Sequence, residues 1–280
     1  MQSEAASASL LRVVRRKPRM AFGDQPNVLP PTIAALTSTC FVGDLSTATD
    51  EVVEHAAAGR GGFMCLCNVH VLTTALHDVG VRQTLSRAQV RFPDGAPVAW
   101  LLRRLGSPSA RRIGGPDLFA QVVDRGRKVR LRHFLVGSTG RDLERLSRIL
   151  VERFPGAEIV GTHAPPYTAE PEVGAAIVAQ IRAARAQLVW VGLGAPKQEL
   201  WSARAATDLP QATLVGVGAA FDFLAGTKRR APEWMQRTGL EWLFRLASEP
   251  RRLASRYLRT NSEFIAKAAW ELLRRRARAM

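Results

Sequence analysis

The chain has 280 residues, of which 46% are hydrophobic and 23% are charged. This composition excludes wholesale disorder and suffices for one large α/β domain, alone or with an appendage. The formal net charge of +16 predicts an anionic partner, such as lipid, nucleic acid or a phosphorylated substrate. No run of about 18 apolar residues occurs, so no transmembrane helix is predicted.

Residues 1–35 are predicted to form a flexible basic leader. The segment is rich in Ser and Ala, then holds five basic residues before position 20, and is then interrupted by Pro26, Pro30 and Pro31. No apolar stretch follows the basic residues, so the segment is not predicted to be a secretory signal.

The three cysteines, Cys40, Cys65 and Cys67, are predicted to be buried thiols. Their number is odd and two of them share one apolar run, which argues against a disulfide framework. Free thiols indicate a reducing environment, so we expect a cytoplasmic protein.

Between residues 36 and 232, segments typical of buried strands alternate with segments typical of helices. Strands are predicted over 62–68, 130–136, 158–161, 188–193 and 213–217, and helices over 69–79, 115–125, 142–154, 172–185 and 197–206. This alternation predicts an α/β domain with a Rossmann-like, mostly parallel sheet and helices on both faces. Ligands of such sheets bind beyond the carboxyl ends of the strands.

Residues 233–280 lack strand signals and are predicted to form a helical, membrane-associating appendage. Apolar residues recur there at helical spacing among many arginines, including Arg245, Arg252 and Arg256. Basic helices that carry Trp and Phe suit an anionic membrane surface, to which each basic group adds about 1 kcal/mol. The alternative is a pair of helices that packs on the domain and leaves its arginines in solvent.

Three predicted strands end in glycine-rich loops, at Gly137, Gly194 and Gly218. Such loops bring backbone N–H groups close to a phosphate, although glycine after a strand is also ordinary turn chemistry. None of the loops completes the G-x-G-x-x-G pattern, which counts against a dinucleotide-binding oxidoreductase.

Asp94 stands between Pro93 and Gly95, just after a short strand-like run. A carboxylate at the end of a strand is well placed to face a cleft and to act as a general base toward a hydroxyl group. The Asp-Gly pair is also common in turns, and the local sequence alone favours a turn.

Further charged and amide groups stand where the predicted sheet presents ligands. Arg112 precedes a pair of glycines and a helix start, where a guanidinium group can hold a diphosphate by two hydrogen bonds or lie in a solvated loop. The other groups follow the predicted strands that end near 193 and 217, and they are Pro196, Lys197, Gln198, Glu199 and Asp222.

The five histidines show no metal-binding spacing, and no D-x-D pair is present. We therefore predict no metal ion and no cofactor.

Together these motifs resemble the WecG/TagA/CpsF family of bacterial glycosyltransferases. The matching pieces follow the family's order over roughly residues 40–258. They are Asn68, Pro93-Asp94-Gly95, Arg112 with Gly115-Asp117-Leu118, Phe134-Leu135-Val136-Gly137, Gly192-Leu193-Gly194, Pro196-Lys197-Gln198-Glu199, Gly216, Phe221-Asp222, Ala225-Gly226, Arg230-Ala231-Pro232, Leu240-Glu241-Trp242, Arg245-Leu246 and Glu249-Pro250. The P-K-Q-E, R-A-P and L-E-W pieces are specific, whereas the glycine pieces are not.

The resemblance implies an inverting transferase that moves a hexose from a UDP-sugar to a polyprenyl-diphosphate-linked saccharide in cell-surface polysaccharide synthesis. It implies Asp94 as the catalytic base, Arg112 near the diphosphate and Asn68 beside the acceptor or base. Gln198 and Asp222 are implied in the nucleotide pocket, and the appendage is implied to meet the inner face of the membrane. The donor sugar stays open between N-acetylmannosamine, its uronic acid and glucose, as do the acceptor and the oligomeric state, a homo-oligomer included.

Three features depart from the family's pattern. Leu66 stands where the family has a Thr, Gln187 stands where it has an Asp, and residues 1–35 have no counterpart. The missing hydroxyl group predicts an altered acceptor pocket but leaves the proposed base in place. Two alternatives remain: a dinucleotide-binding oxidoreductase, and a nucleic-acid-binding protein, which only the charge supports because no DNA- or RNA-binding motif occurs.

Overall fold

The structure is a computed structural model, and it describes residues 28–166 and 174–279. Within these ranges the side chains of Arg237, Arg252, Arg256 and Ala279 are not described. Most of the predicted leader, residues 1–27, therefore lies outside the described residues. A helix, α1 (Ile33–Ser38), begins inside the segment 1–35, because Thr32 caps it and Ile33 and Leu36 are buried.

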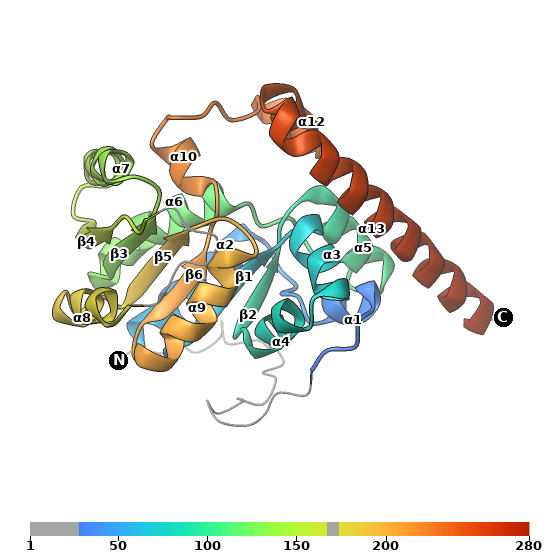
Figure 1. The fold of residues 1–280 in the computed structure, drawn as a ribbon, viewed down its shortest axis with the longest axis horizontal. Coiled ribbons are helices and arrows are strands. Elements are labelled where there is room, and N and C mark those ends of the chain that lie inside the picture. The colour runs from blue at the N-terminus through green and yellow to red at the C-terminus, as the bar shows by residue number, and fades with distance from the viewer. Residues whose placement is uncertain (1–27, 167–173, 280) are drawn as a thin grey trace, which may run out of the picture.

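Six strands of the described chain form one all-parallel sheet in the order β2-β1-β6-β5-β3-β4. They are β1 (Phe63–Cys67), β2 (Val90–Pro93), β3 (Arg132–Gly137), β4 (Glu158–His163), β5 (Leu188–Gly192) and β6 (Thr213–Gly216). Strands β1 and β6, which are distant in the sequence, lie side by side within the sheet (Figure 1). The predicted Rossmann-like α/β fold is confirmed.

Helices cover both faces of this sheet (Figure 1). One face carries α3 (Val69–His77), α4 (Val79–Arg87), α5 (Ala96–Arg104), α8 (Ala175–Ala183) and α9 (Lys197–Asp208). The other carries α2 (Leu45–Ala57), α6 (Gly115–Gly126), α7 (Gly140–Arg153) and α10 (Ala220–Leu224). A short 3-10 turn, η1 (Arg127–Val129), follows α6.

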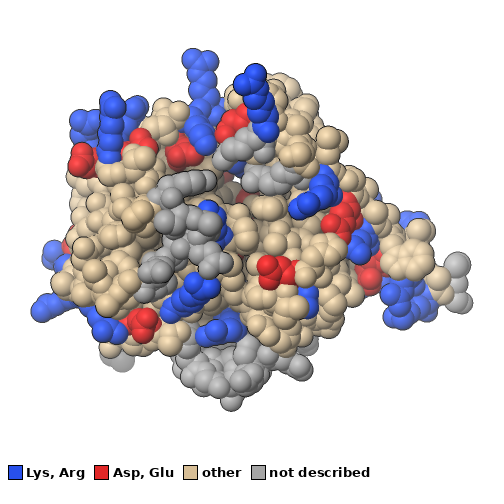
Figure 2. Space-filling model, viewed as in Figure 1, with Lys and Arg blue, Asp and Glu red and all other residues tan. Residues whose placement is uncertain are grey.

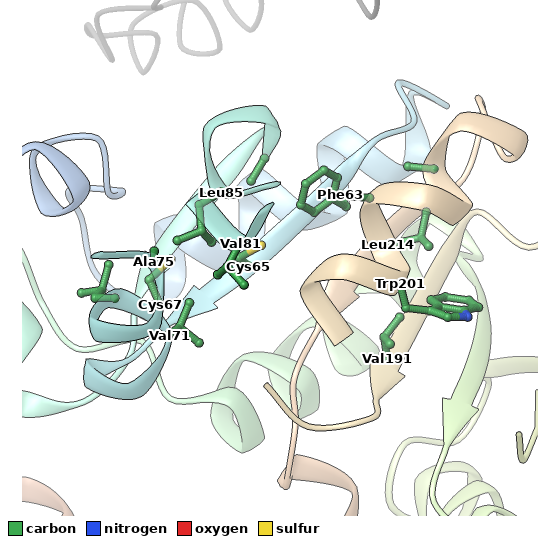
Figure 3. Close-up of a cluster of buried hydrophobic side chains, with 14 of the residues drawn as sticks. Phe63, Cys65, Cys67, Val71, Ala75, Val81, Leu85, Val191, Trp201 and Leu214 are labelled. Atoms are coloured by element: carbon green, nitrogen blue, oxygen red, sulfur yellow. The ribbon is translucent and has the colours of Figure 1, made fainter. Parts of the chain in front are cut away.

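The alternation of side chains along the strands divides the core into two clusters. Phe63, Cys65 and Cys67 point to the face of α3 and α9, where Figure 3 shows them with Trp201 and Leu214. Met64 and Leu66 point to the opposite face, against α2 and α6. All three cysteines are free and buried, as predicted.

Three more helices follow α10: α11 (Glu233–Thr238), α12 (Glu241–Ser248) and α13 (Pro250–Ala279). Helix α13 packs on α1 and α3, and its C-terminal part extends beyond the body of the molecule (Figure 1). Its buried side chains are Leu253, Thr260, Phe264 and Ala268. On the face seen in Figure 2, Lys and Arg side chains gather along the upper rim and near the protruding end of α13.

Candidate functional site

Two of the predicted site residues meet at the carboxyl edge of the sheet. Asp94 follows β2 and Asn68 follows the neighbouring β1, and the N–H of Asp94 donates to the carbonyl of Cys67 at 3.0 Å. The Oδ1 atom of Asn68 accepts from the N–H of Val71 at 3.0 Å, which caps α3. The Asn68 side chain is also hydrogen-bonded to Asp94. Because Oδ1 faces the helix, the amide nitrogen is the atom that serves the carboxylate.

The charge of Asp94 is tuned by its surroundings. Its side chain is half-buried, and burial raises its pKa above the ordinary value for an aspartate. Arg112 lowers this pKa, Glu241 raises it, and Arg245 and the bond from Asn68 lower it. The net effect is a raised pKa, which makes Asp94 a stronger base than an aspartate in water.

Backbone hydrogen bonds hold Arg112 next to Asp94. The N–H of Ile113 donates to the carbonyl of Pro93 at 2.9 Å, so the segment around Arg112 runs beside the end of β2. Two residues later, Gly115 starts α6 in close contact with the sheet: a Cβ atom there would lie 2.9 Å from Leu66 and 3.1 Å from the carbonyl of Val217. A side chain at Gly115 would push α6 away from this edge.

Arg112 belongs to a network of four charged side chains. Its Nη1 atom lies 2.6 Å from Oε2 of Glu241, and its Nη2 atom lies 3.7 Å from Oδ2 of Asp117. Arg230 binds both carboxylate oxygens of Asp117 at 2.6 Å each, and its Nε atom lies 3.7 Å from Oε1 of Glu241. The network joins the α/β domain to α12. The R-A-P and L-E-W motifs of the sequence contain Arg230 and Glu241. Nothing in the local sequence indicated that these two side chains would pair with Asp117 and Arg112.

The P-K-Q-E residues open α9 at the end of β5. Pro196 and Lys197 are half-buried, whereas Gln198 is 3% exposed and lies against Gly216 and Gly218 at the end of β6. Glu199 is 1% exposed and accepts a hydrogen bond of 2.9 Å from Nε2 of Gln198. Burial raises the pKa of Glu199 to about 7. Glu199 thus lies in the interior, behind the predicted nucleotide-binding amide.

The three predicted glycine positions differ in their surroundings. Gly137 ends β3, which lies four strand positions from β2 in the sheet. At about 4.8 Å per strand position, Gly137 is roughly 19 Å from Asp94, which follows β2. A Cβ atom on Gly137 would lie 2.6 Å from the carbonyl of Gly192, so Gly137 serves close strand packing. Gly194 faces open space, and Gly218 lies beside Gln198. The structure therefore places Gly218 beside Gln198 at the carboxyl edge of the sheet, whereas Gly137 lies far from Asp94.

A groove of about 270 Å³ opens between the loop after α10 and helix α12. It is lined by Phe223, Lys228, Arg229, Arg245, Ser248 and Glu249. The guanidinium group of Arg245 lies 5.6 Å from the ring centre of Phe223, and Arg245 also acts on Asp94, so it links the groove to the carboxylate.

Asp222 meets this groove through Lys228, whose Nζ atom lies 2.9 Å from Oδ2 of Asp222 and 3.4 Å from Oε1 of Glu249. The side chains of Arg252 and Arg256, predicted to contact membrane or diphosphate, lie outside the described part of the structure. In residues 28–166 and 174–279, no group of three His, Cys, Asp or Glu side chains is placed to hold a metal ion.

Comparisons with known proteins identify the family to which this chain belongs. Residues 35–278 match the Glycosyl transferase WecG/TagA/CpsF family. A protein of Bacillus spizizenii (strain ATCC 23059 / NRRL B-14472 / W23) is 30% identical over 214 residues, which cover 76% of this chain and 79% of that protein. That relative is named N-acetylglucosaminyldiphosphoundecaprenol N-acetyl-beta-D-mannosaminyltransferase. The chain therefore belongs to the WecG/TagA/CpsF family of glycosyltransferases.

Proposed function

We propose that this protein transfers a hexose of the N-acetylmannosamine type from a UDP-sugar to a polyprenyl-diphosphate-linked N-acetylglucosamine, with inversion at the anomeric carbon. The family match and the name of the Bacillus relative support the choice of sugar and acceptor. The observation that carries the proposal is the position of Asp94, at the carboxyl edge of the sheet beside Asn68, Arg112 and Arg245.

The proposed reaction is a single displacement. An acceptor hydroxyl oxygen attacks the anomeric carbon of the donor while Asp94 takes the hydroxyl proton. The bond between that carbon and the oxygen of the β-phosphate breaks, and UDP leaves with the electron pair. Burial and the carboxylate of Glu241 make Asp94 a stronger base for this step.

Cationic side chains stabilise the departing diphosphate in this proposal. Arg112 and Arg245 flank Asp94, and Lys228 lies farther along the groove that Arg245 lines. Guanidinium groups bind phosphate oxygens by short, charge-assisted hydrogen bonds, and fixed positive charge lowers the energy of the developing anion. Gln198 and Asp222 complete the proposed nucleotide end of the site, and no cofactor is part of this proposal.

We further propose that the protein works as a peripheral protein on the cytoplasmic face of the membrane, with 36–232 as the catalytic domain and 233–280 as the membrane-associating part. Among the described helices, none is long and apolar enough to cross a bilayer. Helix α13 exposes Leu258, Ile265, Trp270 and Leu273, each more than half accessible, and ends in a run of exposed arginines. Such a helix suits an anionic lipid surface.

Product analysis with a panel of donors tests the proposed function. The full chain is incubated with a short-chain polyprenyl-diphosphate N-acetylglucosamine and, in turn, with UDP-N-acetylmannosamine, its uronic acid and UDP-glucose. With the first donor we expect UDP release and a lipid-linked disaccharide. We expect NMR to show that the anomeric configuration of this product is inverted relative to the donor. UDP release without a lipid-linked product, or a product of retained configuration, would contradict the proposal.

A further inference from the structure

The first residue of α12 brings a carboxylate into the catalytic centre from the C-terminal part of the chain. The side chain of Glu241 is 16% exposed and its carboxylate lies between two guanidinium groups. Oε2 is 2.6 Å from Nη1 of Arg112, and Oε1 is 3.7 Å from Nε of Arg230. One carboxylate therefore sets the positions of two cations that reach it from different segments.

A second carboxylate completes this arrangement. Asp117 binds Arg230 through both oxygens at 2.6 Å and lies 3.7 Å from Arg112. The two arginines and the two acids thus alternate, and each arginine has an acid on either side. Arg112 and Arg230 are held near each other despite their like charges, because Glu241 and Asp117 compensate the repulsion.

Glu241 also acts on Asp94. Among the described residues, the charged groups that change the pKa of Asp94 are Arg112, Glu241 and Arg245. Glu241 is the one acid among them, and it opposes the two arginines that would otherwise weaken the base. Removal of Glu241 would therefore change Asp94 in two ways: one nearby negative charge would be lost, and the charge of Arg112 would be compensated only by the more distant Asp117.

The backbone of this region is fitted closely to the loop that carries Asp94. Gly239 ends α11 with φ of +79°, and a Cβ atom there would lie only 2.6 Å from Cβ of Ala96. Ala96 is the first residue of α5, two positions after Asp94. This close approach holds the turn before Glu241 against the catalytic loop, so the position of Glu241 is set by packing as well as by charge.

We infer that Glu241 is a positioning residue of the catalytic centre, which acts through Arg112 and Asp94 rather than on the substrate. It holds Arg112 in the orientation needed at the leaving diphosphate and it sustains the basicity of Asp94. This inference rests on the proposed function, because it assigns Glu241 a task in the same proton transfer.

The pH dependence of sugar transfer separates this role from a merely structural one. The rates of the wild type, Glu241→Gln, Glu241→Asp and the matched control Glu158→Gln are measured from pH 4 to 9, beside their melting temperatures. Glu158 starts β4, at the opposite edge of the sheet from β2 and Asp94, and pairs with Arg130. We expect kcat/KM of Glu241→Gln to fall by about 10- to 100-fold, as for a misplaced catalytic group. Its acid limb is expected to move to lower pH, because Asp94 loses a negative neighbour.

The two other variants sharpen the test. Glu241→Asp keeps the charge, so its acid limb is expected to stay at the wild-type pH while part of the rate is restored. Glu158→Gln is expected to match the wild type in both respects. If Glu241→Gln does not fold, the double variant Glu241→Gln/Arg230→Gln removes one charge of each sign and carries the same expected shift, since Arg230 is not among the groups that act on Asp94.

Two outcomes would overturn the inference alone. The first is an unshifted acid limb in a folded Glu241→Gln protein, which would leave Glu241 a structural role. The second is a faster Glu241→Gln enzyme, which would show that Glu241 competes with the donor for Arg112. A wild-type protein that transfers no sugar to any lipid-linked acceptor would instead refute the proposed function, and this inference with it.

Discussion

Nε2 of Gln198 donates a 2.9 Å hydrogen bond to Oε1 of Glu199, and both side chains are buried at the start of α9. The bond fixes which end of the Gln198 amide faces the carboxyl edge of the sheet. The amide oxygen of Gln198, Oε1, and the other carboxylate oxygen of Glu199, Oε2, have no hydrogen-bond partner among the described residues. A buried carboxylate with one unsatisfied oxygen is costly to ionise, which agrees with the raised pKa of Glu199.

Glu199→Gln is predicted to stabilise the protein at alkaline pH. An unfolded chain releases the Glu199 proton near the ordinary pKa of 4.5, whereas the folded chain holds it to about pH 7. The folded state therefore binds more protons between these values, and stability is lost as the pH rises through them. By linkage the penalty above pH 7 is about 3 kcal/mol. Thermal denaturation is expected to show a higher melting temperature for Glu199→Gln than for the wild type at pH 8, with a much smaller gain at pH 5.

An exposed residue provides the control for this comparison. Glu144 lies on the solvent side of α7, so Glu144→Gln is expected to follow the wild type at both pH values. Equal melting-temperature differences at pH 5 and pH 8 for Glu199→Gln would mean that Glu199 is ionised throughout and that its burial carries no penalty.

Two substitutions of Asn68 are predicted to separate its two roles. Asn68→Asp keeps an oxygen that caps α3, but it loses the amide donor to Asp94 and adds a like charge. We expect it to retain the wild-type melting temperature and to lose most transfer activity. Asn68→Ala loses the cap as well, which costs about 1 kcal/mol of folding stability. Circular dichroism melts and UDP release measure the two effects, and an active Asn68→Asp protein would contradict the assignment.

Arg245→Ala is predicted to weaken the use of the donor. Arg245 lines the groove and acts on Asp94, so its loss removes charge from the place proposed for the diphosphate. The loss of one charge-assisted hydrogen bond, about 1.5–3 kcal/mol, corresponds to a fall in kcat/KM of roughly 10- to 150-fold. Arg148→Ala, an exposed arginine on α7, is the matched control and is expected to keep the wild-type value. Equal kinetics for both variants would remove Arg245 from the site.

The exposed apolar side chains of α13 are predicted to bind lipid. Leu258 is 74% and Ile265 is 65% exposed. Replacing both by Ser removes apolar surface worth roughly 1.5–3 kcal/mol per side chain when buried. Co-sedimentation with phosphatidylglycerol vesicles is expected to fall at least tenfold for Leu258→Ser/Ile265→Ser, and wild-type binding is expected to weaken in high salt. Val151→Ser, an exposed apolar position on α7, is the control, and vesicle binding that is unchanged in the double variant would contradict the prediction.

The sequence predicted the central strands well, because their continuous apolar runs admit few other interpretations. Strands β1, β3, β5 and β6 lie within two residues of the predicted ranges. Helices α1, α2, α4, α5 and α10 were missed. Helix α4 is only nine residues long and contains Gly80, and α5 begins with Pro97 directly after the turn at Asp94 and Gly95, so these segments resemble loops.

The candidate site, like the fold, was predicted only in part from the sequence. Asp94 and Asn68 were predicted at the ends of strands, and the structure places them side by side. The ion pair of Arg112 and Glu241 could not be predicted from sequence patterns, because 129 residues separate the two and neither helical nor strand periodicity links such positions. The buried position of Glu199 was also missed, since a charged residue next to Gln198 suggests exposure until α9 is packed on β1 and β6.

The most direct test of the account is the rate of sugar transfer by Asp94→Asn, measured beside its affinity for UDP. Asparagine keeps the shape of the side chain but cannot accept the proton from the acceptor hydroxyl group. We predict a fall in kcat of about 10²- to 10⁴-fold, with the dissociation constant for UDP unchanged. An Asp94→Asn protein that transfers sugar at the wild-type rate would place the base elsewhere and contradict the account.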